Sequence, residues 1–295
     1  MRRLLETFLA TAVLALAATA ALAQGHYPHL FLGNPSGATA DEGNSNNYLM
    51  AKPYFALSYN NSKGTPNWVS WHLSYEDIGS AKRVPFYPDE TLPDGFDRVV
   101  PQDYTNAGFD RGHMCPHSDR DRTEAMSHAT FVMTNIIPQT AAVNQRAWRQ
   151  LEMYCRMLVE HENKELYIVC GPAGHGGRGK NGFKTSLARG KVMVPGECWK
   201  VILVLDEVDG DDAIRIDHNT RMIAVVMPND GTVGEDWTEY RTSVRDVEEL
   251  TGYKFFDRVD ERVLGPLKDV VDNEEVDLAP SVRHELTARK RADVR

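Results

Sequence analysis

The sequence predicts an α+β fold in which a mixed or antiparallel central sheet is flanked by helices. Short runs rich in β-branched and aromatic residues indicate strands, whereas two other segments show helical periodicity. These strands and helices do not alternate regularly along the 295 residues, which is typical of α+β proteins. With 42% hydrophobic and 25% charged residues, the composition is that of a globular chain with a packed core.

The first 23 residues have the pattern of a secretory signal peptide. Two arginines come before an apolar run from Phe8 to Leu22, and Ala21-Leu22-Ala23 provides the small residues of a cleavage site. This run is shorter than the roughly 20 residues that a membrane-spanning helix needs, and no later segment is apolar for as long. We therefore expect export to the periplasm or the extracellular space, with no membrane contact once the leader is removed. A retained N-terminal anchor is the alternative.

The mature chain is predicted to hold one domain between two less regular ends. Residues 24–45 are rich in Gly, Asn, Ser and Ala, which is typical of an irregular lead-in. The expected strands and helices fall within residues 46–267, which we interpret as a single domain. Residues 268–295 are charged and poor in aromatic side chains, so we expect a mobile tail there.

Two runs of aromatic and β-branched residues begin the domain. Residues 54–60 and 67–75 alternate well enough to form a strand pair, and the segment between them favours a turn. From Ser80 to Tyr104, prolines at positions 85, 88, 93 and 101 forbid regular structure. This segment is predicted to be a long ordered loop, and long loops inside compact domains tend to carry function.

The remaining elements are two helices and several buried strands. Residues 144–161 repeat apolar side chains with helical spacing. A second helix is indicated at residues 243–252, where Ser243 and Asp246 have capping-box spacing and Gly252 marks the end. Apolar runs predict buried strands at residues 129–139, 165–172, 192–207 and 221–230.

An exported chain would carry its four cysteines into an oxidising compartment. Four cysteines allow three complete pairings, and the sequence does not choose among them. No pair has the Cys-x-x-Cys spacing of a zinc ribbon or a thioredoxin-like motif, so both are disfavoured. The cysteines are Cys115, Cys155, Cys170 and Cys198.

Charge is unevenly distributed along the chain. The formal net charge of −9 by itself argues against a polyanion-binding protein. Between Gly171 and Lys200, however, basic residues greatly outnumber the single acid Glu197, and such a strip can contact phosphates. Within it, residues 174–180 (GHGGRGK) nearly match a nucleotide-binding loop, but Asn181 replaces the Ser or Thr that such a loop needs. We interpret the segment as a basic hairpin loop, with a merely solvated charged loop as the alternative.

Residues 109–115 (FDRGHMC) hold the strongest candidate for a reactive group. If this segment is extended, its side chains alternate, so Arg111 and His113 share one face with Phe109 and Cys115. A neutral imidazole can take a proton from water while a guanidinium binds an anionic phosphate, which is the chemistry of phosphodiester cleavage. A histidine with a purely structural role is the alternative. The same alternation places Asp110 and Met114 on the other face, and Gly112 lets a backbone or ligand approach closely.

A polar strip on the helix predicted at residues 144–161 complements this face. At 100° per residue, Asn144, Glu152 and Arg156 fall along one edge of the apolar stripe, with Trp148 between them. One interpretation is a helix N-cap at Asn144 and an i,i+4 ion pair of Glu152 with Arg156. The other is an oxygen-rich magnesium site, because one amide oxygen can hold a hydrated Mg²⁺ while a carboxylate orders its waters.

Together these motifs resemble the DNA/RNA non-specific endonuclease family, the secreted sugar-non-specific nucleases of the ββα-metal superfamily. The most specific motifs are Asp-Arg-Gly-His at residues 110–113 and Asn-x-x-x-Trp-x-x-x-Glu at residues 144–152, which fall at family-like separations. The resemblance extends from about Asn46 to about Phe256 and implies a ββα-metal active-site motif, making residues 46–267 a nuclease domain. It also implies Mg²⁺ as cofactor, with Mn²⁺ as a substitute, and the basic hairpin loop would line the nucleic-acid groove. The oligomeric state is left open, and a homodimer is one of the states considered.

The resemblance implies roles for six residues. His113 matches the general base that activates water, Asn144 the one protein ligand of a hydrated Mg²⁺, and Glu152 the carboxylate that orders its waters. Arg83 matches the arginine that stabilises the charged transition state, with Lys82 as the alternative because this loop differs in length by one residue. The arginines expected to bind the substrate are Arg83, Arg111 and Arg156, and Arg156 matches an arginine that contacts the phosphate or the leaving group. Cys115 stands where the family more often has alanine.

The implied reaction is in-line attack of water on phosphorus, which leaves 5′-phosphate and 3′-hydroxyl ends. Because the expected contacts go to backbone phosphates, both DNA and RNA should be bound and cut. Two alternatives stay open. A zinc-dependent hydrolase would use His113, Cys115 and His117 as ligands, although Pro116 makes that spacing cramped. The second alternative is a non-catalytic module that has the fold and binds nucleic acid but does not cleave it.

Overall fold

The computed structural model describes residues 27–208 and 211–276 of the chain. The leader predicted at residues 1–23 and most of the predicted tail lie outside these ranges. Within them, no helix combines the length and the apolar character needed to cross a membrane.

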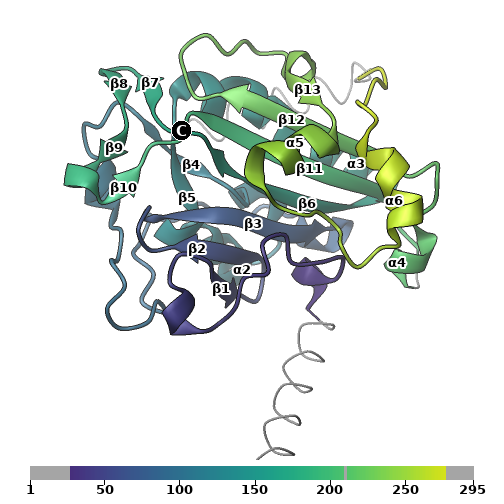
Figure 1. Cartoon of the computed structure of the whole chain (residues 1–295), viewed down its shortest axis with the longest axis horizontal. Coiled ribbons are helices and arrows are strands. Elements are labelled where there is room, and N and C mark those ends of the chain that lie inside the picture. The colour runs from purple at the N-terminus through teal and green to yellow at the C-terminus, as the bar shows by residue number, and fades with distance from the viewer. Residues whose placement is uncertain (1–26, 209–210, 277–295) are drawn as a thin grey trace, which may run out of the picture.

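A seven-stranded sheet runs through the centre of the molecule (Figure 1). Every neighbouring pair of its strands is antiparallel, so the predicted α+β fold is confirmed, with the sheet in its antiparallel form. The sheet has the order β1-β2-β3-β6-β11-β12-β13. The strands are β1 (Tyr48–Ala51), β2 (Ala56–Asn60), β3 (Thr65–Leu73), β6 (Lys164–Ala173), β11 (Glu197–Asp206), β12 (Arg221–Pro228) and β13 (Arg241–Thr242).

Side-chain alternation along the central strands divides the core into two layers. In β6, Ile168 faces one layer and its neighbour Tyr167 faces the other. Helix α3 (Trp148–Glu162) covers the first layer, and α5 (Val244–Thr251) and α6 (Glu261–Lys268) cover the second. Figure 1 shows α5 and α6 in front of the sheet and α3 behind it. The active-site elements are built on the α3 side.

Helix α5 forms where its local signals predict it. The Ser243 hydroxyl accepts a hydrogen bond from the Asp246 backbone N–H at 3.0 Å, and the Asp246 carboxylate accepts one from the Ser243 N–H at 3.1 Å. This is the predicted capping box. Gly252 ends the helix with φ of 74°, a left-handed conformation that favours glycine.

The apolar segment at residues 129–139 is not one strand, and that prediction is wrong for its first part. Helix α2 (Glu124–Thr130) ends there, and only β5 (Ile136–Gln139) is extended. The Asn135 side chain stabilises the chain reversal, because its Nδ2 donates to the carbonyl of Thr130 at 2.9 Å and to that of Cys115 at 2.8 Å. An apolar run alone does not distinguish a buried helix end from a buried strand.

Smaller elements surround the end of the sheet that bears the site. A two-stranded ribbon forms from β4 (Asp110–His113) and β5, which confirms the extended interpretation of the Asp-Arg-Gly-His segment. A hairpin forms from β7 (Gly177–Gly179) and β8 (Gly182–Lys184), as the basic loop was interpreted. The remaining short elements are β9 (Ser186–Leu187), β10 (Val192–Met193) and α4 (Asp212–Arg215).

All four cysteines are free thiols, and none of the three pairings forms. Each is buried in the layer covered by α3. Burial raises the pKa of every one of these thiols above its usual range. Cys115 is therefore an inert core residue in the structure.

The first residues of the predicted tail pack on the domain. Lys268 Nζ lies 2.9 Å from Glu248 Oε1, and both side chains are buried. Asp272 is also buried and pairs with Arg221 Nε at 2.8 Å. The ordered part of the chain thus extends at least to these contacts.

Candidate active site

The six residues expected to act together line one pocket of 340 Å³. It lies where the β4–β5 ribbon meets the start of helix α3, so segments far apart in sequence contribute to it. Arg111 and His113 both face it, as their alternation along β4 predicts. We call this hollow the active pocket. The predicted residues that line it are Arg83, Arg111, His113, Asn144, Glu152 and Arg156.

His113 is held as a half-buried neutral base. Its ring lies 5.2 Å from the Phe86 ring and packs edge-on against Phe131 at 5.0 Å. Burial, together with the neighbouring Arg83 and His117 side chains, lowers its pKa well below the usual value. Nε2 is buried and has no hydrogen-bond partner among the described residues. A buried nitrogen left unpaired in a pocket is poised to accept a proton from a bound water.

Close packing of the Gln139 side chain against Gly112 leaves no room for a side chain at position 112. A Cβ at this position would lie 2.0 Å from Gln139 Oε1, on the paired strand β5. The close approach therefore comes from a neighbouring side chain on the protein side of β4. Alanine there would push Gln139 away and disturb the strand that carries Arg111 and His113.

Asp110 is joined to the site by hydrogen bonds from the turn before helix α3. Its Oδ2 accepts hydrogen bonds from Asn144 Nδ2 at 2.9 Å and from Gln145 Nε2 at 2.8 Å. The amide nitrogen of Asn144 is thereby fixed, and its oxygen is the atom left for a metal ion. The alternation along the strand did not reveal this contact, because Asn144 comes from the π-helical turn before α3.

Asn144 is not the N-cap of the helix. Helix α3 begins at Trp148, and Asn144 lies in a π-helical turn, residues Val143–Ala147. Arg146 within that turn has φ of −118° and ψ of −108°, which breaks the helical path. Such π turns are frequent at functional sites because they re-aim one side chain.

Glu152 and Arg156 have partners that the helix spacing did not reveal. Lys200 Nζ, from strand β11, lies 3.8 Å from Glu152 Oε1 and 4.2 Å from the centre of the Trp148 ring. Arg156 donates to Asp119 Oδ1 at 2.7 Å. One interpretation of the helix spacing was an i,i+4 ion pair between Glu152 and Arg156. In the structure, each of the two side chains instead contacts a residue outside the helix. Only the strand order, which joins β11 to β6 beneath α3, brings Lys200 there.

The electrostatics of Glu152 follow from this buried layer. Burial raises its pKa, and Lys200 and Arg156 oppose that rise. Burial alone would lower the pKa of Lys200, but Glu152 and the nearby thiols raise it above its usual value. Lys200 is therefore a permanent cation beneath the carboxylate.

The arginines line the pocket beside aromatic rings. Arg83 lies over the Phe131 ring at 5.0 Å and Arg111 over the Phe86 ring at 5.4 Å. Arg111 also donates its Nη2 to the Pro101 carbonyl at 2.9 Å. Lys82, the alternative to Arg83, is not among the pocket-lining residues. The geometry favours Arg83 as the cation of this loop.

The structure does not support the zinc alternative. Cys115 is buried in the core, and its backbone N–H donates to Asn135 Oδ1 at 2.9 Å. His117 Nε2 contacts the Ala81 carbonyl at 3.1 Å. Among the described residues, His113, Cys115 and His117 do not form a cluster of converging ligand atoms.

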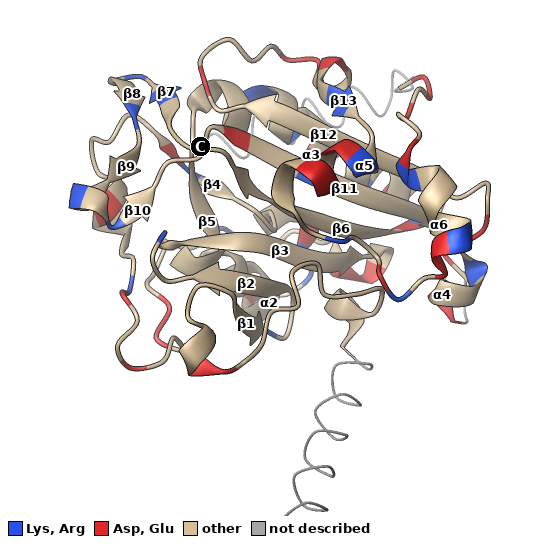
Figure 2. Cartoon of the chain, viewed as in Figure 1, with Lys and Arg blue, Asp and Glu red and all other residues tan. Residues whose placement is uncertain are grey.

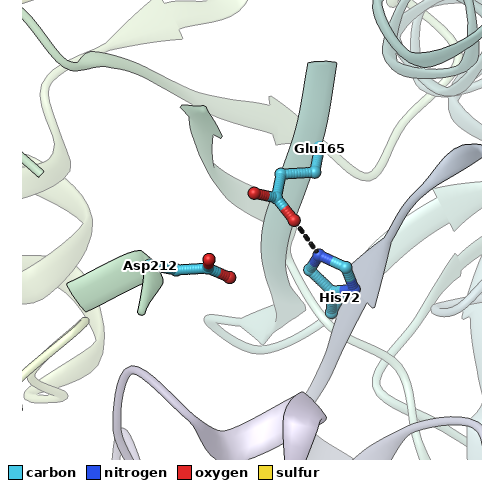
Figure 3. A group of neighbouring side chains, drawn as sticks. All are labelled: His72, Glu165 and Asp212. Atoms are coloured by element: carbon cyan, nitrogen blue, oxygen red, sulfur yellow. Dashed lines mark hydrogen bonds and ion pairs between the residues drawn. The ribbon is translucent and has the colours of Figure 1, made fainter. Parts of the chain in front are cut away.

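A different cluster does converge, away from the active pocket. His72, Glu165 and Asp212 bring ligand atoms within 4.8 Å of one another, and His72 Nε2 lies 2.8 Å from Glu165 Oε2 (Figure 3). Arg215 already supplies the cation, because its Nη2 contacts both carboxylates. Tyr167 donates its hydroxyl to Asp212. We assign this group as a structural ion-pair network.

The sequence and the fold of this chain are similar to those of known nucleases. Residues 32–262 match the family described as DNA/RNA non-specific endonuclease. A nuclease from Nostoc sp. is 48% identical over 83% of this chain and 86% of its own length. Mitochondrial nuclease EXOG from Xenopus laevis is 35% identical, and the match covers 73% of this chain but 60% of EXOG. A chain from a crystal structure of an EndoG/EndoGI complex, a study of EndoG inhibition, has a TM-score of 0.63 at 25% identity, covering 81% of this chain and 93% of that one.

The match spans the sheet, the β4–β5 ribbon and helix α3, so it includes every residue of the active pocket. The EndoG likeness confirms the ββα-metal fold. This chain belongs to the DNA/RNA non-specific endonuclease family of metal-dependent nucleases and is a hydrolytic endonuclease that acts on nucleic acids.

Proposed function

We propose that the chain is an exported, magnesium-dependent endonuclease that cuts both DNA and RNA and leaves 5′-phosphate and 3′-hydroxyl ends. One observation supports it most: a neutral, half-buried histidine with an unpaired Nε2 lines a pocket that four arginines also line, the three predicted ones and Arg149. A base beside phosphate-binding cations is what water attack on a phosphodiester needs.

Each residue has a separate task in this proposal. His113 accepts the proton of the attacking water at Nε2. Arg83, Arg111 and Arg156 bind the phosphate oxygens, and Arg156, held by Asp119, also faces the leaving oxygen. Because these cations contact phosphate alone, neither base nor sugar is recognised, so DNA and RNA are both substrates.

The donor set fits Mg²⁺. Asn144 offers an amide oxygen whose nitrogen is fixed by Asp110, and Glu152 offers a carboxylate in the same pocket. Hard oxygen donors and few protein ligands suit an ion that keeps most of its waters, and Mn²⁺ accepts the same donors. When bound, the ion would offset negative charge on the reacting phosphate. Asn144 would be the direct ligand and Glu152 would order the waters.

Digestion assays test the proposal directly. We expect plasmid DNA, single-stranded DNA and RNA all to be cut with Mg²⁺ and all to survive in chelator. End-labelling should show 5′ ends that accept a labelled phosphate only after phosphatase treatment. Full cleavage in chelator, or ends that accept the label untreated, would contradict the magnesium and product assignments respectively.

Export and assembly are tested separately. The pattern of residues 1–23 supports export, so a full-length chain expressed in a bacterium should be recovered without those residues from the periplasm or medium. The sequence leaves the oligomeric state open between a monomer and a homodimer, and sedimentation at micromolar concentration measures it. Recovery of an unprocessed chain in the cytoplasm would contradict export.

A further inference from the structure

The β7–β8 hairpin carries positive charge that has no ion-pair partner in the described part of the chain. The chain has a net charge of −9, yet Lys and Arg residues, blue in Figure 2, gather along this hairpin and the turn after it. Within residues 27–208 and 211–276, none of these side chains has an ion-pair partner, whereas Lys191 beside them pairs with Asp103 at 2.9 Å. The unpaired cations are Arg178, Lys180, Lys184 and Arg189.

An exposed aromatic ring lies among these cations. Phe183 is 57% exposed, the highest value of any aromatic side chain in the described residues. Its ring edge rests against the backbone of Gly176, where a Cβ would lie 2.3 Å from Cζ. The ring is therefore held in place while most of it stays open to solvent.

Strand register places Phe183 beside a cation. Arg178 and Phe183 are direct cross-strand partners, so their side chains project from the same face of the hairpin. The other face packs on the protein: a Cβ at Gly177 would lie 2.7 Å from the Asn229 carbonyl, and one at Gly179 would lie 2.3 Å from the Gly108 carbonyl. Because these two glycines pack closely on the inner side, the Arg178–Phe183 pair projects outward.

The hairpin is attached to the wall of the active site. Lys180 N–H donates to the Gly108 carbonyl, and Asn181 Nδ2 donates to the Asn106 carbonyl, both at 2.9 Å. Asn106 lines a hollow of 480 Å³ that it shares with Arg83, Arg111 and Asn144 of the active pocket. A strand that leaves the active pocket through this hollow meets the hairpin next.

We propose that the hairpin is a second nucleic-acid contact, which binds an unpaired nucleotide with its base on Phe183 and its phosphate at Arg178. The inference rests on the proposed function and adds a preference to it. Base stacking on an aromatic ring tolerates any sequence, which suits a non-specific nuclease. A paired base already stacks within its duplex, so single strands and frayed ends gain from this contact and intact duplex does not.

Binding measurements test the proposal without requiring cleavage. In chelator, we expect Phe183→Ala to weaken the Kd for a fluorescein-labelled 20-nucleotide single strand by about tenfold. The Kd for a blunt duplex of the same length should change by less than about twofold, and Phe183→Trp should restore single-strand binding. Tyr75→Ala is the matched control, because Tyr75 is 53% exposed beside Arg122 but lines neither hollow. A Kd for Phe183→Ala equal to that of wild type or of Tyr75→Ala overturns the inference.

The charge component has its own readout. Arg178→Ala should reduce the slope of log Kd against log salt by about 0.7 for the single strand, the value for one lost phosphate contact. An unchanged slope overturns the phosphate contact. Cleavage of a dinucleotide with Mg²⁺ by wild type is measured in parallel, because it tests the active pocket alone. Failure there contradicts the proposed function, whereas failure of the binding shifts contradicts the hairpin proposal.

Discussion

Two regions of this molecule gather a histidine with carboxylates and arginines, and they differ in what is left unpaired. In the cluster of His72, Glu165 and Asp212, Arg215 and Tyr167 supply partners to the carboxylates, and the buried atom that the described chain leaves unpaired is Arg215 Nε, a donor that cannot accept a proton. In the active pocket, His113 Nε2 has no partner among the described residues. Converging ligand atoms alone would favour the first region as a reactive site. An unpaired nitrogen that can accept a proton favours the second, because leaving it buried and unpaired costs stability and a catalytic role explains why it is kept.

Replacing the two histidines should break this comparison most clearly. We expect His113→Ala to fold and to bind nucleic acid, but to lose about 10² to 10⁴ in kcat/KM because the general base is gone. His72→Ala, in the ion-pair network, should keep cleavage within about threefold and lose stability instead. Plasmid cleavage rates and thermal unfolding of both variants are the measurements. Near-normal cleavage by His113→Ala would refute its assignment as base.

Asp110 should matter to the active pocket through the metal ligand. Asp110→Ala removes the acceptor that fixes Asn144 Nδ2, so we expect the Mg²⁺ concentration for half-maximal activity to rise by about 10- to 100-fold. Gln145→Ala is the matched control, since Gln145 donates to the same oxygen but is not a predicted ligand. Calorimetric Mg²⁺ titration should show the same difference. If both variants bind Mg²⁺ as wild type does, Asp110 has no positioning role.

How far the site could be predicted depends on the range of each interaction. Local signals sufficed for the helix at residues 243–252 and for the extended segment with Arg111 and His113 on one face. They failed for Asp110, whose partner comes from a π turn that no helical repeat indicates. Lys200 is a similar case, because the antiparallel register that places it beneath Glu152 is a long-range property of the sheet. Family resemblance recovered the six pocket residues and none of these supporting ones.

Removing Arg215 should affect stability alone. Arg215→Met leaves Glu165 and Asp212 close together without their shared cation, so we expect the free energy of unfolding to fall by about 1–3 kcal/mol. Cleavage per folded molecule should stay within about twofold of wild type. Denaturant unfolding measures the expected loss of stability, and plasmid cleavage measures whether the activity is unchanged. A large loss of cleavage at unchanged stability would mean that this network is coupled to the active pocket.

The smallest expected effect is in the pH dependence of stability. His113 has a lowered pKa in the folded chain, because burial and Arg83 disfavour its charged form. Below about pH 6.5 the unfolded chain therefore binds a proton at His113 that the folded chain excludes, so this residue makes the folded state less stable as pH falls. Unfolding of wild type and His113→Gln between pH 7.5 and about 5 measures the difference, and wild type should lose more stability over that range. Parallel curves for the two proteins would mean that His113 titrates alike in both states, and the neutral base assumed for the active pocket would then lack its physical cause.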